Sequence, residues 1–135
     1  RDELWKDLDT IAQNIQALWM VAGDFNDYSS STDKRSLLSQ QGHTSNQSLR
    51  RSQKFTDRVN NCNLMDLGCV GPRLTWTNNR KWWANTMVRL DRALCNAEWR
   101  TLFPEGYVRN LPRTYSDHSP LIVHTQGTNS YQPSC

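Results

Sequence analysis

The chain begins with an amphipathic helical pattern that runs directly into a short apolar strand, and this unit restricts the folds that it can adopt. Apolar side chains recur at steps of four, three, four and three residues, at Leu4, Leu8, Ile11, Ile15 and Leu18. That spacing places them on one face of a helix, which Trp5 and Ala12 widen. Residues 19–22 indicate a buried strand that Gly23 ends. A helix with one apolar face needs a partner layer, so the pattern predicts a layered α/β or α+β domain.

The remaining segments predict further helices and strands separated by polar loops. Helices are expected at residues 50–61 and 97–103, where apolar side chains recur at helical spacing. Strands are expected at residues 64–67, 74–77, 87–90, 107–111 and 121–123. The first two of these flank glycines, so we expect a hairpin-like pair. Loops are expected at residues 27–48, 78–84 and 112–120, with Trp82 and Trp83 exposed in the second.

Length and composition fit one globular domain. The chain has 135 residues, 36% of them hydrophobic and 21% charged, and a net charge of +3. Its apolar runs are far shorter than the roughly 20 residues of a membrane-spanning helix, and its amino end lacks a signal-peptide pattern. The four cysteines lack the C-x-x-C spacing of a zinc site. We therefore expect reduced thiols and a nuclear or cytoplasmic location, with one disulfide left open.

Carboxylate, amide and imidazole side chains stand at the ends of the predicted strands. Asp24 and Asn26 follow the first strand, Asp91 follows the strand at residues 87–90, and Asp117 and His118 precede the last strand. Phosphodiester hydrolysis needs a base for water, a cation against the developing negative charge, and support for the leaving oxygen. These residue types can supply those functions, and basic residues elsewhere permit a polyanionic substrate or simply form solvated faces.

Each of these side chains suits one part of that chemistry. His118 can act as the general base, and Asp91 is the candidate to orient its ring and stabilise the imidazolium. Asp24 can orient the water or assist the leaving group, Asn26 can donate a hydrogen bond to the phosphate, and Asp117 can bind Mg²⁺, which prefers oxygen ligands. Taken singly, these residues also have simpler roles, as turn formers, a helix cap or ion pair, and a structural histidine.

Short motifs occur in a fixed order along the chain, at Gly23-Asp24-Phe25-Asn26, Arg89-Leu90-Asp91 and Ser116-Asp117-His118. Because of them, the chain resembles the carboxyl-terminal half of the endonuclease/exonuclease/phosphatase family, which includes the apurinic-endonuclease-like and DNase-I-like proteins. The motifs and the residues around them are most similar to the endonuclease domain of plant LINE-type non-LTR retrotransposons, at residues 19–26, 64–68, 71–78, 89–94 and 116–121. The resemblance covers residues 1–125, and residues 126–135 are expected to form a flexible tail.

The resemblance implies a fold, a reaction and a set of site residues. The fold would be part of a four-layer α/β sandwich without its amino-terminal half, with the site where strand-end loops meet. The reaction would be nicking of target DNA with Mg²⁺ or Mn²⁺, which exposes a 3′ hydroxyl for reverse transcription. The implied residues are His118, Asp91, Asp24 and Asn26 for catalysis, Asn26, Trp76 and Arg89 for substrate binding, and Asp117 for the metal.

One departure from the family affects these expectations. The family's amino-terminal half supplies an early Asn and a metal-binding Glu in a Q-E-T-like motif, and Glu3, Glu98 and Glu105 lack that context. We therefore expect weak or no activity from this chain alone, and marginal stability or association. Expected partners are DNA, the missing half and a reverse transcriptase domain. Two alternatives stay open: a non-catalytic nucleic-acid-binding remnant that uses Trp82 and Trp83, and a phosphatase or phosphodiesterase of the same superfamily.

Overall fold

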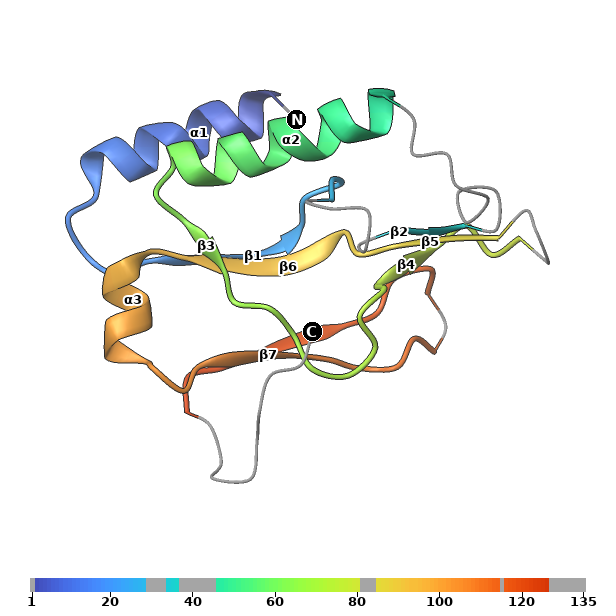
Figure 1. Cartoon of the computed structure of the whole chain (residues 1–135). Helices are drawn as coiled ribbons and strands as arrows, with labels where there is room; N and C mark the ends of the chain where they lie inside the picture. The colour runs from blue at the N-terminus through green and yellow to red at the C-terminus, as the bar shows by residue number, and fades with distance from the viewer. Residues whose placement is uncertain (1, 29–33, 37–45, 81–84, 115, 127–135) are drawn as a thin grey trace.

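The computed structural model describes residues 2–28, 34–36, 46–80, 85–114 and 116–126 (Figure 1). Its elements, in chain order, are α1 (Asp2–Asn14), β1 (Met20–Asp24), β2 (Lys34–Ser36), α2 (Asn46–Asn61), β3 (Met65–Asp66), β4 (Trp76–Thr77), β5 (Thr86–Val88), β6 (Asp91–Cys95), α3 (Ala97–Leu102), β7 (Tyr107–Asn110) and β8 (Leu121–His124). The strands form sheets in the orders β1-β6-β3, β2-β5-β4 and β7-β8, and neighbouring strands are antiparallel. The α+β class predicted from the sequence is therefore confirmed.

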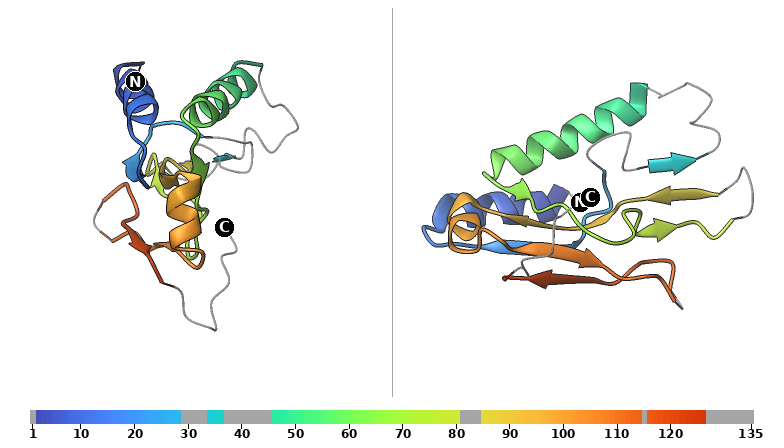
Figure 2. Two further views of the ribbon diagram at one scale, coloured as in Figure 1. Left: turned by 90° about the vertical axis from the view of Figure 1, so that its left-hand side faces the viewer. Right: turned by 60° about the horizontal axis from the view of Figure 1, so that its bottom comes forward.

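Helices and sheets stack in layers (Figures 1 and 2). The helices α1 and α2 lie on one face of the β1-β6-β3 sheet, and β7 and β8 lie on the other face. Side chains of the central strand β6 alternate between these faces, as strand geometry requires. Leu94 packs in the cluster with the helices, whereas Ala93 and Cys95 pack in the cluster with β7 and α3. The described chain thus has a helix layer and two sheet layers, and the complete four-layer sandwich stays a prediction.

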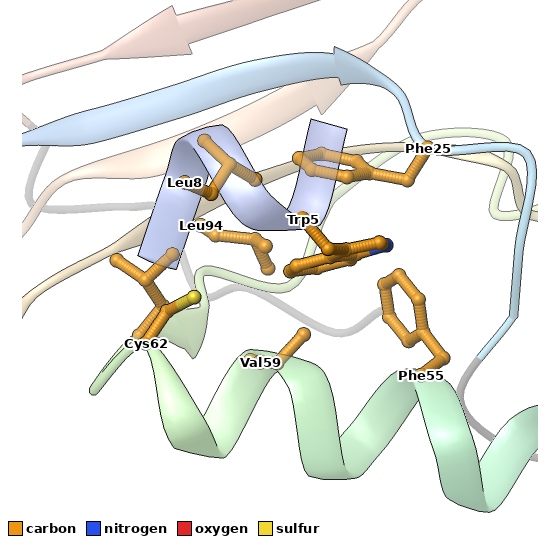
Figure 3. Packing of buried hydrophobic residues seen from close by; sticks show 8 residues of the cluster. Trp5, Leu8, Phe25, Phe55, Val59, Cys62 and Leu94 are labelled. Atoms are coloured by element: carbon orange, nitrogen blue, oxygen red, sulfur yellow. The ribbon is translucent and has the colours of Figure 1, made fainter. Parts of the chain in front are cut away.

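Aromatic side chains form the centre of the core beneath α1 and α2, and Figure 3 shows how they meet. The Trp5 ring lies 6.0 Å from the Phe25 ring and 5.7 Å from the Phe55 ring, the latter contact being T-shaped. Phe25 directly follows β1 and is 4% exposed. Its ring therefore anchors the carboxyl end of β1, where Asp24 lies, in the aromatic cluster of the core.

The buried face of α1 differs from the face predicted by apolar spacing. Trp5 and Leu8 are buried and Ala12 packs partly against the core. By contrast, several residues of the predicted stripe are 37% to 42% exposed, namely Leu4, Ile11, Ile15 and Leu18. The bulky Trp5 ring fills the space between α1 and α2. The helix face centred on Trp5 is therefore buried, and Leu4 lies at the solvent-exposed edge of that face. Ile15 and Leu18 lie beyond the last helical residue.

The predicted hairpin between residues 64–67 and 74–77 is wrong. β3 pairs with β6, whereas β4 pairs with β5 in a different sheet. The strand predicted at residues 87–90 also ends earlier, at Val88, and Asp91 begins β6 instead of following a strand. Residues 89–90 carry the chain from one sheet to the next. Local alternation indicates a strand, but the partner of that strand depends on packing against distant segments.

Other boundaries follow the sequence more closely. α2 ends at Asn61 as predicted but begins at Asn46, and β2 lies inside the loop predicted at residues 27–48. The short helix α3 and the strands β7 and β8 lie where they were predicted. Three predicted segments lie wholly or partly outside the described residues: the turn predicted to expose Trp82 and Trp83, much of the loop predicted at 27–48, and the predicted tail after Gln126.

Cysteine pairing corrects one expectation from the sequence. Cys62 and Cys95 are free and buried, and burial raises the pKa of both thiols. Cys69, however, is disulfide-bonded, so the simpler expectation of reduced thiols does not hold for it and the disulfide that the sequence left open is present. Spacing along the chain could not show this, because a disulfide depends on distance in space. Among the described helices, none has the length and apolar character needed to cross a membrane.

Candidate active site

The end of β1 and the loop that follows it carry the first predicted site residues, in a backbone with two positive φ angles. Gly23 has a φ of 147° and Asn26 a φ of 55°, a region that glycine and asparagine adopt most readily. The Phe25 side chain points into the core, while Asp24 and Asn26 on either side of it are exposed. The Asn26 backbone N–H donates to Asp24 Oδ1 at 2.8 Å. The loop itself therefore sets the direction of the Asp24 carboxylate.

Asp24 and Asp91 are neighbours because of strand register. β1 and β6 are antiparallel, and Asp24 pairs directly opposite Asp91 in that ladder. Like charges at directly opposed positions destabilise a sheet unless a positive group lies between them. The imidazole of His118 occupies this position, since it contacts both carboxylates. The register thus brings together two acidic residues that are 67 positions apart in the sequence.

The loop that carries His118 is held against β4 by backbone hydrogen bonds. Ser119 N donates to Thr75 O at 2.7 Å, and Thr77 N donates to Asp117 O at 3.1 Å. Trp76 and His118 form the antiparallel bridge between these two contacts. The loop at residues 116–119 therefore behaves as an added strand beside β4, which fixes the position of the His118 backbone.

Thr75 is a residue that the sequence analysis missed. Its side chain is 1% exposed, and its hydroxyl oxygen accepts hydrogen bonds from Leu90 N at 3.0 Å and Asp91 N at 3.1 Å. Its carbonyl oxygen at the same time accepts from Ser119. Thr75 thus joins the segment with Asp91 to the segment with His118. The signal in the sequence was a threonine at an inward position of an alternating strand, where a buried hydroxyl needs partners.

His118 lies between the two carboxylates, with one nitrogen toward each. Nδ1 is 2.8 Å from Asp91 Oδ2, and Nε2 is 3.6 Å from Asp24 Oδ2. Burial lowers the pKa of His118, but the hydrogen bond and charge of Asp91, with the charges of Asp24 and Asp117, outweigh it. The pKa is therefore raised above its ordinary value of 6.5. With Nδ1 donating to Asp91, Nε2 is the nitrogen that can take a proton.

The same side chains provide donors for a divalent cation. One donor atom from each of Asp24, Asp91 and His118 lies within 4.8 Å of the others. Asp91 is already engaged with Nδ1 and orients the ring, so Asp24 offers the oxygen ligand that a hard cation prefers. Mg²⁺ usually binds through one or two carboxylates and keeps water and phosphate oxygens as its other ligands. This donor set therefore fits such an ion.

The other predicted site residues, Trp76, Asp117 and Arg89, are hydrogen-bonded to partners outside the Asp24, Asp91 and His118 cluster. The Trp76 indole Nε1 donates to Asp117 Oδ2 at 3.2 Å, so these two side chains are hydrogen-bonded to each other. Asp117 is not one of the clustered donors found among the described residues, and its metal role stays a prediction. Arg89 is 6% exposed and donates two hydrogen bonds of 2.9 Å to Asp66. This carboxylate is the partner that a buried guanidinium needs, and the role of Arg89 in substrate binding stays a prediction.

The combination of fold and side chains is typical of one class of protein. An α+β domain that holds a histidine on one carboxylate and opposite a second has the parts of a hydrolase that activates water by general base catalysis. Residues 1–118 match the sequence model of the Endonuclease/Exonuclease/phosphatase family, and the chain belongs to this family. In general this family hydrolyses phosphodiester bonds and depends on divalent metal ions. Searches of curated proteins and of solved structures give no match.

Proposed function

We propose that the chain is a Mg²⁺- or Mn²⁺-dependent DNA-nicking endonuclease domain of the LINE-type retroelement branch. The observation that carries the proposal is the 2.8 Å contact of His118 Nδ1 with Asp91, with Asp24 facing Nε2 at 3.6 Å. Family membership supports a phosphodiester substrate. The motif context quoted above, at residues 71–78 and 116–121, supports DNA as the polymer and the retroelement branch as the source.

In the proposed reaction, His118 Nε2 takes the proton from the attacking water. Asp91 fixes the ring through Nδ1 and stabilises the positive charge that the ring gains. Asp24 Oδ2 lies close enough to Nε2 for one water to hydrogen bond to both, which orients that water for attack. The Asn26 side chain, exposed beside Asp24, donates to a phosphate oxygen. A divalent cation held through Asp24 would stabilise the negative charge that develops on the phosphate.

Plasmid nicking tests this function. Supercoiled DNA is incubated with Mg²⁺ and either this chain or a version extended at its amino end, where the sequence resemblance expects a further metal ligand. His118→Ala should lower the nicking rate by about 10²- to 10⁴-fold, the usual contribution of a general base. The matched control is His124→Ala. His124 stacks on Tyr107 at 4.5 Å in the β7-β8 sheet and should be dispensable for nicking.

The possible outcomes separate the functions considered. Equal nicking with and without the His118 substitution would show that the assigned base is wrong. Salt-sensitive DNA binding by both versions without any cleavage would favour a nucleic-acid-binding remnant. Hydrolysis of a soluble phosphodiester such as bis(p-nitrophenyl) phosphate, with plasmid left intact, would favour a small-molecule phosphodiesterase of the same family.

A further inference from the structure

The loop that follows β1 makes hydrogen bonds with two parts of the chain that are distant in sequence, the start of β6 and the helix α2. On the β6 side, Phe25 N donates to Leu90 O at 3.0 Å and an Arg92 guanidinium nitrogen donates to Asp27 O at 3.3 Å. On the α2 side, the contacts come from Arg51. The β6 contacts belong to the sheet framework, whereas Arg51 reaches the loop from the helix layer and contacts Asn26, Asp27 and Tyr28.

Arg51 contacts three consecutive residues of this loop with one guanidinium group. Its Nε lies 2.5 Å from Asp27 Oδ1, and a terminal nitrogen donates to Asn26 O at 2.5 Å. The same group lies 5.4 Å from the centre of the Tyr28 ring. Asp27 and Tyr28 are 6% and 4% exposed. A buried carboxylate requires a partner, and Arg51 supplies it while its planar fork also fixes the adjacent carbonyl.

These contacts lead directly to the site. Arg51 holds the carbonyl of Asn26, and the N–H of the same residue donates to Asp24 Oδ1 at 2.8 Å. Asn26 has a φ of 55°, and the hydrogen bond that Arg51 donates to its carbonyl oxygen helps to hold this left-handed conformation. When Asp24 Oδ1 is held by this N–H, Oδ2 faces His118 Nε2. The direction of the Asp24 carboxylate therefore depends on Asn26, and the conformation of Asn26 depends on Arg51.

We infer that Arg51 is a positioning residue that keeps the Asp24 carboxylate opposite His118, and so acts in catalysis from the second helix without contacting the reacting atoms. The inference rests on the proposed function for its catalytic consequence, although the positioning itself is a property of the folded chain. Arg50, the preceding residue, is exposed and carries the same charge. It provides the matched control, because a general effect of positive charge on DNA binding would appear at both positions.

The first measurement needs no substrate. Amide hydrogen exchange of the Asn26 N–H is followed by NMR in the chain itself and in Arg51→Ala, Arg51→Lys and Arg50→Ala. In Arg51→Ala the exchange should be faster by about tenfold, the effect of losing about one hydrogen bond from the loop. Arg50→Ala should exchange at the parent rate. Unchanged exchange in Arg51→Ala would overturn the inference, whatever the enzyme does.

The second measurement is the kinetics of nicking by the same substitutions, made in the version extended at its amino end. Arg51→Ala should lower kcat by about 10- to 100-fold, because Asp24 is displaced from the water it orients. Its KM should change no more than that of Arg50→Ala. Arg51→Lys should recover part of kcat, since an ammonium group can pair with Asp27 but cannot hold both acceptors in a planar fork.

Failure of the positioning role and failure of the proposed function give different results. If Arg51→Ala and Arg50→Ala raise KM alike and leave kcat at the parent value, Arg51 is a phosphate contact and the positioning role is wrong. If the version extended at its amino end does not nick DNA, the proposed function fails. The exchange of the Asn26 amide then still decides whether Arg51 sets the conformation of the loop.

Discussion

Replacing Asp66 with asparagine tests how far a buried charge cluster beside the site stabilises the fold. Arg89 donates two hydrogen bonds of 2.9 Å to Asp66, and Arg92 donates another at 3.0 Å. The side chains of Arg89 and Arg92 are 7% and 0% exposed. Removing one partner of a buried ion pair costs about 3–5 kcal/mol. Because the Asp66 side chain is itself 29% exposed, solvent screening reduces the expected cost to about 2–3 kcal/mol.

The pH dependence of stability gives this prediction a second signature. Burial raises the pKa of Asp66, but the charge and hydrogen bonds of Arg89, the charge of Arg92 and the hydrogen bond from Gly68 N outweigh it and hold the pKa below its ordinary value of 3.8. A carboxyl group with a depressed folded-state pKa contributes its full stability above the unfolded pKa. That contribution disappears as the pH falls through the folded-state pKa. The difference between the parent and Asp66→Asn should therefore be largest at neutral pH and shrink below pH 3.8.

Urea unfolding of the parent and of Asp66→Asn at several pH values measures both signatures. Asp7→Asn is the matched control, because Asp7 is exposed on α1 and loses the same charge. The control should stay within about 0.5 kcal/mol of the parent, as surface substitutions usually do. An unfolding free energy of Asp66→Asn that also lies within this range at pH 7 would refute the reasoning. A larger difference that does not change with pH would show that Asp66 stabilises the fold by packing and not by charge.

The remaining predictions concern the base and the core. Because the neutral form of His118 is the base and its pKa is raised, the nicking rate should rise with pH through that pKa. Asp91→Asn removes a hydrogen bond and a charge that raise this pKa, so a pH–rate profile should show a slower enzyme whose rising limb lies at lower pH. In urea unfolding, Leu8→Ala should cost about 2–5 kcal/mol, since Leu8 is 5% exposed. Leu4→Ala, at a side chain 38% exposed, should cost less than about 1 kcal/mol, and equal costs would mean that the buried face of α1 is wrongly assigned.

The sequence predicted those elements whose local signals are complete. α3 is an example, since the Asn96 side chain caps the helix by accepting from Trp99 N, and Pro104 follows the cap residue Phe103. Strands β7 and β8 were also predicted where the structure has them, because apolar residues cluster there between polar loops. In these cases the residues that define the element are neighbours along the chain.

The predictions that were wrong, strand pairing and the buried face of α1, concern properties that depend on residues distant in the sequence. β3 and β4 are two residues long each, and their partners follow from contacts such as Leu67 N to Ala93 O and Thr75 N to Val88 O. No local pattern contains that information. The apolar stripe of α1 failed for a related reason: a spacing of three and four fits several neighbouring faces of a helix, and Trp5 decided among them by its size.

The residues of the site could be predicted from local sequence motifs, but their relative positions depend on contacts between distant segments. Sequence motifs named Asp24, Asp91 and His118. Strand register places Asp24 opposite Asp91, and Thr75 joins Asp91 to the His118 loop, because its hydroxyl accepts from Asp91 N and its carbonyl oxygen accepts from Ser119 N. The direction of the Asp24 side chain instead depends on the loop that Arg51 holds from α2. A change in the helix layer can therefore turn Asp24 away from Nε2 while the 2.8 Å contact between His118 and Asp91 persists. The base and the group that orients its water are thus supported by separate layers of the fold, and substitutions at Thr75 and Arg51 should affect them separately.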